Sequence, residues 1–390
     1  MLRAAIVSAF ALLLGGCGAP EVAYRAPAQA GDAAAARAAS VALPAGMQRV
    51  CPPAFPAAAR CLAIVRDDGS NVPKGYGPAD LQSAYALPAS QGAGQTIAVI
   101  EAYDDPHGGS DLRFYRATYG LPACTHAKNC FRKVNQAGNP GPYPVPSKAW
   151  ALEESLDVDM VSAACPNCNI LVVEANNDAQ TNLGEAVATA ARLGANAISN
   201  SYVSYNTLDA SYYDQPGVVI TAAAGDAGYG AGVPAGLPTV VAVGGTTLTR
   251  TSGGRGWAET AWKGTGSGCE PALQKPAWQR DAGCPGRTMN DVAAVGDPQT
   301  PVAIYDTYGY SGFVEGAGTS ASAPLVAAIY GLAGNASSQN AAQSLYAPGA
   351  ALNDVTSGSN GTCRPAYLCN ARKGYDGPSG NGTPNGVGAF

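Results

Sequence analysis

Short apolar runs alternate with alanine-rich stretches along the middle of the chain, and this alternation constrains the fold more strongly than any other feature. The apolar runs are short and rich in β-branched residues, which predicts strands, whereas the alanine-rich stretches are long enough for helices. The predicted strands are 96–100, 169–174, 197–202, 217–224 and 239–244, and the predicted helices are 151–165, 183–194 and 320–333. Strands that alternate with helices predict an α/β fold in which helices flank a parallel sheet.

The overall charge of the chain is low and mildly acidic. Charged residues make up 13% of the 390 residues, hydrophobic residues make up 46%, and the formal net charge is −5. A protein that binds nucleic acid usually carries a basic surface, and this chain has few lysines and arginines with which to build one. We therefore expect a stable globular domain that binds no nucleic acid, and we expect it to act as a monomer.

A candidate nucleophile lies in the segment 318–324, Gly-Thr-Ser-Ala-Ser-Ala-Pro, which leads into a predicted helix. Ser320 would stand at the N-terminus of that helix, where the first-turn amides and the helix dipole stabilise a developing oxyanion. Taken alone, the same segment is also typical of an ordinary helix N-cap.

Two carboxylates lie four residues apart in the predicted helix that contains Trp150. Glu153 and Asp157 share one face at that spacing. Two like charges in a partly dry cleft cannot both ionise easily, so one pKa rises and the pair shares a proton. Such a dyad can act as general base toward a serine where the pH is low enough to keep it singly protonated. Taken alone, the pair would also suit a solvated helix face.

Together these motifs resemble the sedolisin family of serine-carboxyl peptidases. The first motif is Trp-Ala-Leu-Glu-x-x-Leu-Asp at 150–157, and the second is Gly-Thr-Ser-x-Ser-Ala-Pro at 318–324. The similarity begins near 77–85, continues through the strand at 95–103 and ends near Phe390. The resemblance implies a subtilisin-like fold and a serine-type endopeptidase that hydrolyses protein or peptide substrates at acid pH.

The resemblance also implies a role for each catalytic residue. Glu153 would be the base toward Ser320, Asp157 would orient Glu153 and share its proton, and Asp226 would line the oxyanion hole, where subtilisins carry an asparagine. A carboxyl group stabilises an oxyanion only when it is protonated and donates a hydrogen bond. Burial of Asp226 after the apolar run at 218–222 would raise its pKa, which again favours catalysis at acid pH.

Three alternatives remain open from the sequence. Glu154 is three residues from Asp157 and could also reach it, although the motif favours Glu153. His107 could serve as a subtilisin-type base, but its neighbours are typical of a surface turn. The chain could also be a catalytically silent, lipid-anchored protein that binds peptides with the same fold.

The segment 198–203 resembles the edge strand along which sedolisins pair with a peptide substrate. The substrate-binding residues expected from this resemblance are Ser199, Asn200, Ser201 and Tyr202. Tyr202 stands where the family often has tryptophan, so the neighbouring substrate pocket is expected to differ.

Loops rich in oxygen ligands and glycine follow residue 353. Such loops suit a hard cation such as calcium, which takes six to eight oxygens. The resemblance implies one calcium ion in this C-terminal loop region, held by the carboxylates of Asp354 and Asp376 and by the carbonyls of Val355, Arg372 and Gly374. Without the resemblance, the default interpretation is surface turns.

The first residues are typical of an export signal. Arg3 precedes an apolar run that is too short to span a bilayer, and Leu-Gly-Gly-Cys at 14–17 resembles a bacterial lipobox in which Cys17 is lipidated. We expect a signal peptide at 1–16, a lipidated flexible tether at 17–45, a short extension at 46–76 and the peptidase domain at 77–390. The protein would be anchored to a bacterial membrane, and the outer membrane is the one expected. The alternative is an ordinary secreted chain.

Ten further cysteines fall into close pairs, which agrees with export to an oxidising compartment. Five local disulfides are expected, although sequence alone does not prove their connectivity, and Cys-Pro-Asn-Cys at 165–168 could also be a redox or zinc motif. The pairs are Cys51/Cys61, Cys124/Cys130, Cys165/Cys168, Cys269/Cys284 and Cys363/Cys369.

Overall fold

A computed structural model describes residues 23–24, 41–52, 58–205, 208–338, 340 and 342–390. The expected signal peptide, Cys17 and most of the expected tether lie outside these residues. In the part of the chain that the structure describes, no helix is both long and apolar enough to cross a bilayer.

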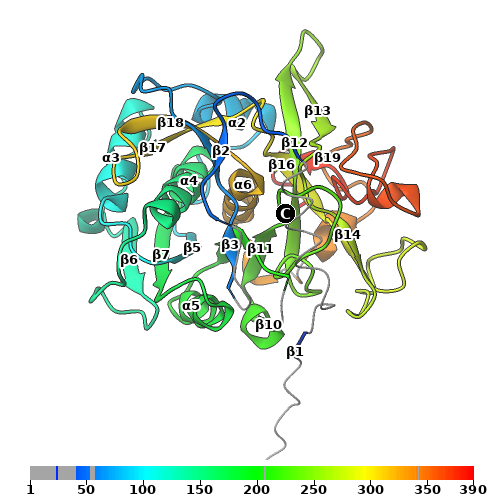
Figure 1. Ribbon diagram of the computed structural model, residues 1–390, viewed down its shortest axis with the longest axis horizontal. Helices are drawn as coiled ribbons and strands as arrows, with labels where there is room; N and C mark the ends of the chain where they lie inside the picture. The colour runs from blue at the N-terminus through cyan, green and yellow to red at the C-terminus, as the bar shows by residue number, and fades with distance from the viewer. Residues whose placement is uncertain (1–22, 25–40, 53–57, 206–207, 339, 341) are drawn as a thin grey trace, which may run out of the picture.

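A central sheet of eight strands forms the middle layer (Figure 1). Its strands in spatial order are β13 (Trp257–Ala261), β12 (Val241–Arg250), β11 (Val219–Ala223), β8 (Ala197–Asn200), β5 (Thr96–Ala102), β7 (Asn169–Ala175) and β6 (Phe131–Asn135), and β16 (Val292–Val295) also pairs with β12. All neighbours are parallel except β12 and β13, which pair antiparallel. The predicted α/β fold is confirmed, and the antiparallel β13 makes the sheet mixed.

Both faces of this sheet are covered by helices, as a parallel sheet requires. Along β5, Ile97 and Val99 join the core on one face, whereas Ala98 and Ile100 join the core on the other. This alternation follows from the two-residue period of a strand. On the first face lie α2 (Pro78–Ala84), α3 (Gly108–Thr118), α4 (Lys148–Ala164) and α6 (Thr319–Ala333), and on the second lies α5 (Gln180–Arg192).

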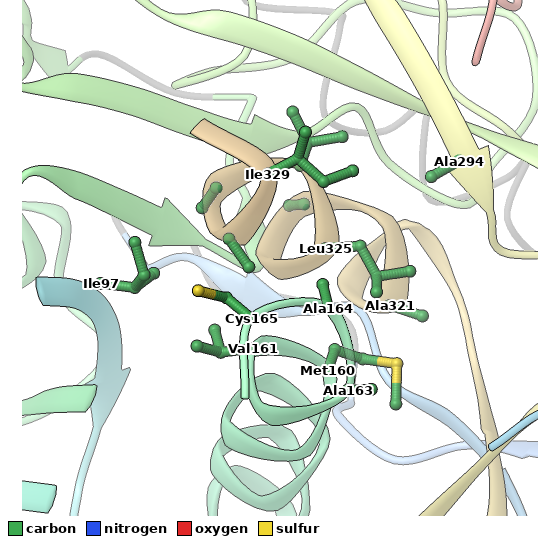
Figure 2. Packing of buried hydrophobic residues seen from close by; sticks show 14 of the residues in the cluster. Ile97, Met160, Val161, Ala163, Ala164, Cys165, Ala294, Ala321, Leu325 and Ile329 are labelled. Carbon is green, nitrogen blue, oxygen red and sulfur yellow. The ribbon is translucent and has the colours of Figure 1, made fainter. Parts of the chain in front are cut away.

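The two central helices, α4 and α6, pack directly against each other (Figure 2). Met160 and Ala164 of α4 lie beside Ala321 and Leu325 of α6, and Val161 lies on the side of α4 toward Ile97 of the sheet. Nearly every residue of both helices is buried, because α4 and α6 are enclosed by the sheet, by each other and by the outer strands. Side chains on these two helices are therefore held rigidly and away from water.

The N-terminal part of the described chain joins two further sheets. β2 (Gln48–Arg49) and β4 (Ile64–Arg66) form a four-stranded antiparallel sheet with β17 (Val302–Asp306) and β18 (Gly312–Ala317). β3 (Arg60–Cys61) pairs antiparallel with β9 (Tyr202–Val203). Most of the segment expected to be a short extension thus lies across the front of the molecule, over α4 and α6 (Figure 1).

Three smaller strand pairs complete the fold. They are β1 (Ala23–Tyr24) with β10 (Leu208–Asp209), β14 (Gly268–Glu270) with β15 (Arg287–Met289), and β19 (Leu352–Asn353) with β20 (Thr383–Pro384).

All five expected disulfides are present. The pairs are Cys51–Cys61, Cys124–Cys130, Cys165–Cys168, Cys269–Cys284 and Cys363–Cys369. The Cys-Pro-Asn-Cys segment is therefore a structural bridge in this structure.

Candidate active site

Ser320 lies in the first turn of α6, directly after β18. Gly318, the residue that caps the helix, has a φ of +105°, a conformation that favours glycine and turns the chain sharply from strand to helix. The Ser320 side chain is fully buried, and its Oγ donates a hydrogen bond to the carbonyl oxygen of Ser201 at 3.3 Å. The expected position of the hydroxyl at a helix N-terminus is confirmed.

Glu153 and Asp157 project from the same face of α4 toward this helix end. Glu153 Oε2 accepts hydrogen bonds from the amides of Leu62 and Ala63 at 2.9 and 2.7 Å. The Asp157 carboxylate accepts from Ser201 Oγ, at 2.7 Å for one oxygen and 2.9 Å for the other. Ser201 therefore lies between Asp157 and Ser320, because its carbonyl receives the Ser320 hydroxyl while its own hydroxyl bonds to the carboxylate.

Burial dominates the electrostatics of this pair. It raises the pKa of Glu153 well above its ordinary value, and the charge of Asp157 raises it further, while the nearby Ser320 hydroxyl and the Ala63 amide oppose the shift. Burial also raises the pKa of Asp157, against the stabilising hydrogen bond from Ser201. Two adjacent carboxyls of this kind hold a shared proton to higher pH than an exposed pair would.

Asp226 faces the same turn from the loop that follows β11. Its Oδ1 accepts hydrogen bonds from the Thr319 amide at 2.9 Å and the Thr319 hydroxyl at 2.8 Å, one residue before Ser320. Its Oδ2 is buried and has no hydrogen-bond partner among the described residues. Burial raises the pKa of Asp226, while Arg49 and the Thr319 hydrogen bonds oppose the shift. When protonated, this carboxyl could donate a hydrogen bond through the oxygen that lacks a partner.

A further carboxyl, Glu101, joins the group and was not recognised from the sequence. It lies near the carboxyl end of β5 and is 1% exposed. Burial raises the pKa of Glu101 well above its usual range, and the charge of Asp157 adds to the effect. The signal available in the sequence was a single acidic residue inside an otherwise apolar strand. The ends of parallel strands are where such sheets usually place functional side chains.

The structure separates the alternative residues from this group. Glu154 points toward Glu174 and Lys133. Burial is the main cause that raises its pKa, the charge of Glu174 raises it further, and the charge of Lys133 lowers it. Another acid of α4, Asp159, accepts the amide of Tyr305 at 2.9 Å on a different side of the helix. His107 is exposed at the start of α3, where its Nδ1 lies 2.9 Å from Thr307 Oγ1.

The four residues expected to bind substrate occupy two settings. Ser199 and Asn200 belong to β8 inside the central sheet, and the Asn200 amide donates to the Thr221 carbonyl at 3.0 Å. Ser201 and Tyr202 lie where the chain leaves that sheet toward β3. The Tyr202 side chain turns inward, and its hydroxyl donates to Asn200 Oδ1 at 2.7 Å.

The residues expected to bind calcium lie together in the C-terminal loops. Asp354 accepts from the Gly374 amide at 3.0 Å, and Asp376 accepts from the Arg372 amide at 2.8 Å, so both carboxylates meet the same short loop. Burial raises the pKa of Asp376 to about 6, and the charge of Asp354 acts in the same direction. No backbone hydrogen bond within the described part of the chain ends on the carbonyls of Val355, Arg372 or Gly374. Two neighbouring carboxylates with available carbonyls fit a calcium ion.

That donor set differs from a cluster of acidic and imidazole ligands. Among the described residues, no group of three or more His, Cys, Asp or Glu side chains is arranged to hold a metal ion. A cation at the C-terminal loops would thus depend on backbone oxygens as much as on carboxylates.

Comparisons with known proteins identify the family and the fold. Residues 149–346, just over half of the chain, match the subtilase family. The chain is 30% identical over 374 residues to kumamolisin from Bacillus sp. (strain MN-32), covering 82% of this chain and 63% of kumamolisin. It is 33% identical over 174 residues to sedolisin from Pseudomonas sp. (strain 101), covering 40% of this chain and 29% of sedolisin. The chain thus spans less than two thirds of the length of either relative.

Solved structures show the same fold. Pseudomonas sedolisin, described as a serine-carboxyl proteinase and complexed with two molecules of pseudo-iodotyrostatin, superposes with a TM-score of 0.67 at 23% identity, covering 80% of this chain and 96% of that one. The S41 psychrophilic protease superposes with a TM-score of 0.51 at 18% identity, covering 78% of this chain and 96% of that one. The fold is subtilisin-like, and the chain belongs to the subtilase family.

Proposed function

We propose that this protein is a serine-carboxyl endopeptidase that hydrolyses peptide bonds in protein or peptide substrates. The observation that carries the proposal is the meeting of three elements at one buried point: Ser320 at the start of α6, the carboxyl pair of α4, and Asp226 after β11. The similarity to kumamolisin and sedolisin supports the same reaction.

In the proposed mechanism, Ser320 Oγ attacks the carbonyl carbon of the scissile bond. Glu153 takes the hydroxyl proton as general base and later gives it to the leaving nitrogen. Asp157, held by Ser201, keeps Glu153 oriented and shares its proton. Protonated Asp226 donates a hydrogen bond from Oδ2 to the oxyanion, while Thr319 fixes its other oxygen.

The proposed activity is confined to the acid side. Asp226 must keep its proton to act as a donor, and the dyad must hold one proton between its two carboxyls. Because the folded-state pKa of each of these groups is raised, the required protons are present at low pH and are lost as pH rises through those values.

The decisive experiment is hydrolysis of a denatured protein substrate from pH 3 to 8 by the full chain and by three variants. Ser320→Ala and Glu153→Ala are expected to lose acid-side hydrolysis, because one lacks the nucleophile and the other lacks the base. His107→Ala is the matched control, since its exposed ring lies beside Thr307 and Tyr308, away from the carboxyl pair. Loss of activity in His107→Ala with retention in Glu153→Ala would instead support histidine-based catalysis, and peptide binding without hydrolysis would support a silent binding protein.

Calcium is the proposed resident cation of the C-terminal loops. Asp354 and Asp376, with the carbonyls of Val355, Arg372 and Gly374, would hold it. An ion there would neutralise the two carboxylates and tie together loops that have few regular strands.

We further propose that the chain is exported and anchored to the outer membrane through a lipid on Cys17, with residues 77–390 as a monomeric peptidase domain. The five disulfides support an oxidising compartment. Intact-mass analysis of the mature protein would detect the lipid, and Cys17→Ala is expected to release the protein into the soluble fraction. An unmodified Cys17 in the purified protein would contradict the anchor.

A further inference from the structure

A short segment between β13 and β14 lies against the loop that carries Asp226. We call residues 264–267 the bridge segment and residues 224–230 the Asp226 loop. Backbone hydrogen bonds join the two on both sides of Asp226. They run from the Gly266 amide to the Gly225 carbonyl at 2.7 Å, from the Gly228 amide to the Gly264 carbonyl at 2.8 Å, and from the Gly230 amide to the Ser267 carbonyl at 2.7 Å.

The contact between the bridge segment and the Asp226 loop is too close for an added side chain. A Cβ on Gly266 would lie only 1.9 Å from the carbonyl oxygen of Ala224. The Gly225 amide donates to Thr319 Oγ1 at 3.1 Å, and Thr319 in turn holds Asp226 through its amide and hydroxyl. A shift of the bridge segment must therefore move the backbone directly before Asp226.

The Asn290 side chain fastens the bridge segment to the C-terminal loops. It is 0% exposed and lies between β15 and β16. Its Nδ2 donates to the Gly266 carbonyl at 2.9 Å and to the carbonyls of Gly377 and Pro378 at 3.0 and 3.1 Å. An amide nitrogen can donate to carbonyls whereas an amide oxygen cannot, so the three acceptors fix the orientation of this side chain. One side chain thus connects the bridge segment with the loop that follows Asp376.

A second buried asparagine, Asn360, holds the bridge segment from another part of the C-terminal loops. It is 3% exposed, and its Nδ2 donates to the Thr265 carbonyl at 2.7 Å and to Ser267 Oγ at 2.8 Å. Its own carbonyl accepts the amide of Tyr229 in the Asp226 loop at 2.8 Å. Asn360 therefore contacts the bridge segment and the Asp226 loop at once, independently of Asn290.

We propose that Asn290 and Asn360 are positioning residues for Asp226, because their amides fix the bridge segment against the loop that presents this carboxyl. The inference rests on the proposed peptidase function, in which Asp226 stabilises the oxyanion. Such a donor acts in the transition state and only from a fixed position. Loss of either asparagine should therefore lower kcat and leave substrate binding almost unchanged.

Hydrogen–deuterium exchange measured by mass spectrometry tests the connection without requiring catalysis. It would compare the full chain with Asn290→Ala and with Asn360→Ala, each first shown to be folded by circular dichroism. Exchange over 224–230 should become at least about tenfold faster in each variant, because each loses donors that restrain the bridge segment. Exchange over β7, which lies elsewhere in the sheet, should not change.

The two variants decide the exchange test independently, so one of them suffices if the other does not fold. Unchanged exchange over 224–230 in the folded variants would overturn the proposal. An equal increase over β7 would also overturn it, because it would indicate general loosening. Faster exchange in only one of two folded variants would confine the role to that asparagine and overturn it for the other.

Asn353 offers a matched control within the C-terminal loops. Its side-chain amide donates to the Pro384 carbonyl at 2.7 Å, between β19 and β20. Asn353→Ala thus removes the same kind of hydrogen bond but none to the bridge segment. Its exchange over 224–230 and its kcat should match those of the wild type. Exchange as fast as in Asn290→Ala would show that any loosening of the C-terminal loops has this effect, and it would overturn the specific role.

Steady-state kinetics at acid pH separate this inference from the proposed function. The substrate is an internally quenched peptide copied from a site at which the wild type cuts a denatured protein. Asn290→Ala should lose about 10- to 100-fold in kcat, with KM within about twofold of the wild type. Faster exchange with an unchanged kcat would overturn the positioning role and leave the peptidase intact. Faster exchange in the variants with no hydrolysis by any protein would support the connection and refute the peptidase.

A double-mutant cycle tests whether Asn290 acts through Asp226. If it does, adding Asn290→Ala to Asp226→Ala should lower kcat by no more than about a further twofold, because the carboxyl that it positions is already gone. Asn360→Ala should behave in the same way. A loss in the double variant equal to the product of the two single losses would show independent effects and overturn the positioning role.

Discussion

At the scale of single residues, four carboxyls share one buried region but have different neighbours. Glu153 receives two backbone amides, Asp157 receives a serine hydroxyl, and Asp226 receives the amide and hydroxyl of Thr319. Glu101 neighbours Asp157. Burial raises the pKa of Glu101, and the charge of Asp157 raises it further. These differences allow the contributions of Asp226 and Glu101 to be tested separately.

Asp226→Asn tests the protonated-donor role. Asparagine also donates a hydrogen bond but does not titrate, so the high-pH limb of the kcat profile should become less steep by the loss of one ionisation. Asp226→Ala, which has no donor, should lose about 10²- to 10³-fold in kcat at the optimum. The measurement is kcat against pH for both variants and the wild type. An Asp226→Asn profile as steep as that of the wild type would contradict the role.

Glu101 is proposed as a positioning residue for Asp157, and two substitutions distinguish its possible contributions. Glu101→Gln keeps a donor beside Asp157 and should leave kcat within about threefold of the wild type. Glu101→Leu removes one polar neighbour of Asp157 and leaves Ser201, and it should cost about tenfold in kcat. The pH profile adds a second readout, because a changed neighbour must shift the titration of the dyad. Equal pH profiles in all three proteins would show that Glu101 does not position Asp157.

At the scale of elements, the packing of α4 against α6 positions the catalytic groups. Leu325 is fully buried between these helices, so Leu325→Ala should lower the free energy of unfolding by about 2–5 kcal/mol. Val145→Ala is the control, because Val145 is 70% exposed and such changes usually lie within about 0.5 kcal/mol. Urea denaturation would measure both, and a Leu325→Ala stability equal to that of the control would contradict tight packing.

The C-terminal loops provide a second test at this scale. If calcium binds there, chelation should lower Tm, because an ion bound only to the folded state stabilises it. Asp354→Asn should reduce that response, since one carboxylate is lost. Differential scanning calorimetry with and without chelator measures the effect, and titration calorimetry would detect binding directly. An unchanged Tm in the presence of chelator would contradict a resident ion.

Sequence patterns predicted the elements that carry the site but not all that surround it. The runs at 96–100 and 169–174 became β5 and β7, and the stretch at 320–333 became α6, because each has the period of its element. Local motifs also placed Ser320 in α6 and Glu153 in α4. The pairing of β3 with β9 was missed, because it depends on contacts between residues near 60 and 202, which are far apart in the chain and leave no local period. Glu101 was missed because one acidic residue does not alter an apolar strand pattern.

At the scale of the whole molecule, buried acids should make the fold more stable in acid than at neutral pH. Beside the catalytic group, burial raises the pKa of Asp105 to about 7 and that of Glu174 to about 8, even though Lys133 lies 2.9 Å from Glu174. Between the unfolded and folded pKa values the folded state binds more protons. The free energy of unfolding should then fall as pH rises, by about 1.4 kcal/mol per pH unit for each such proton.

Tm measured from pH 4 to 8 would test this expectation. We expect Tm to decrease across the range, and Glu174→Gln to decrease less steeply, because its amide does not titrate. Lys74→Gln serves as the control, since that side chain pairs with Asp68 at the surface. A Tm that rises toward pH 8 would contradict the prediction.

The spacing of the disulfides has one more consequence, for the fate of a cut chain. The five bridges join cysteines only 10, 6, 3, 15 and 6 residues apart, so each closes a small local loop. Most backbone cuts would therefore fall outside every bridged loop. The pieces of a nicked molecule would stay together only while the fold holds them, and they would run as separate bands on a denaturing gel even without a reducing agent.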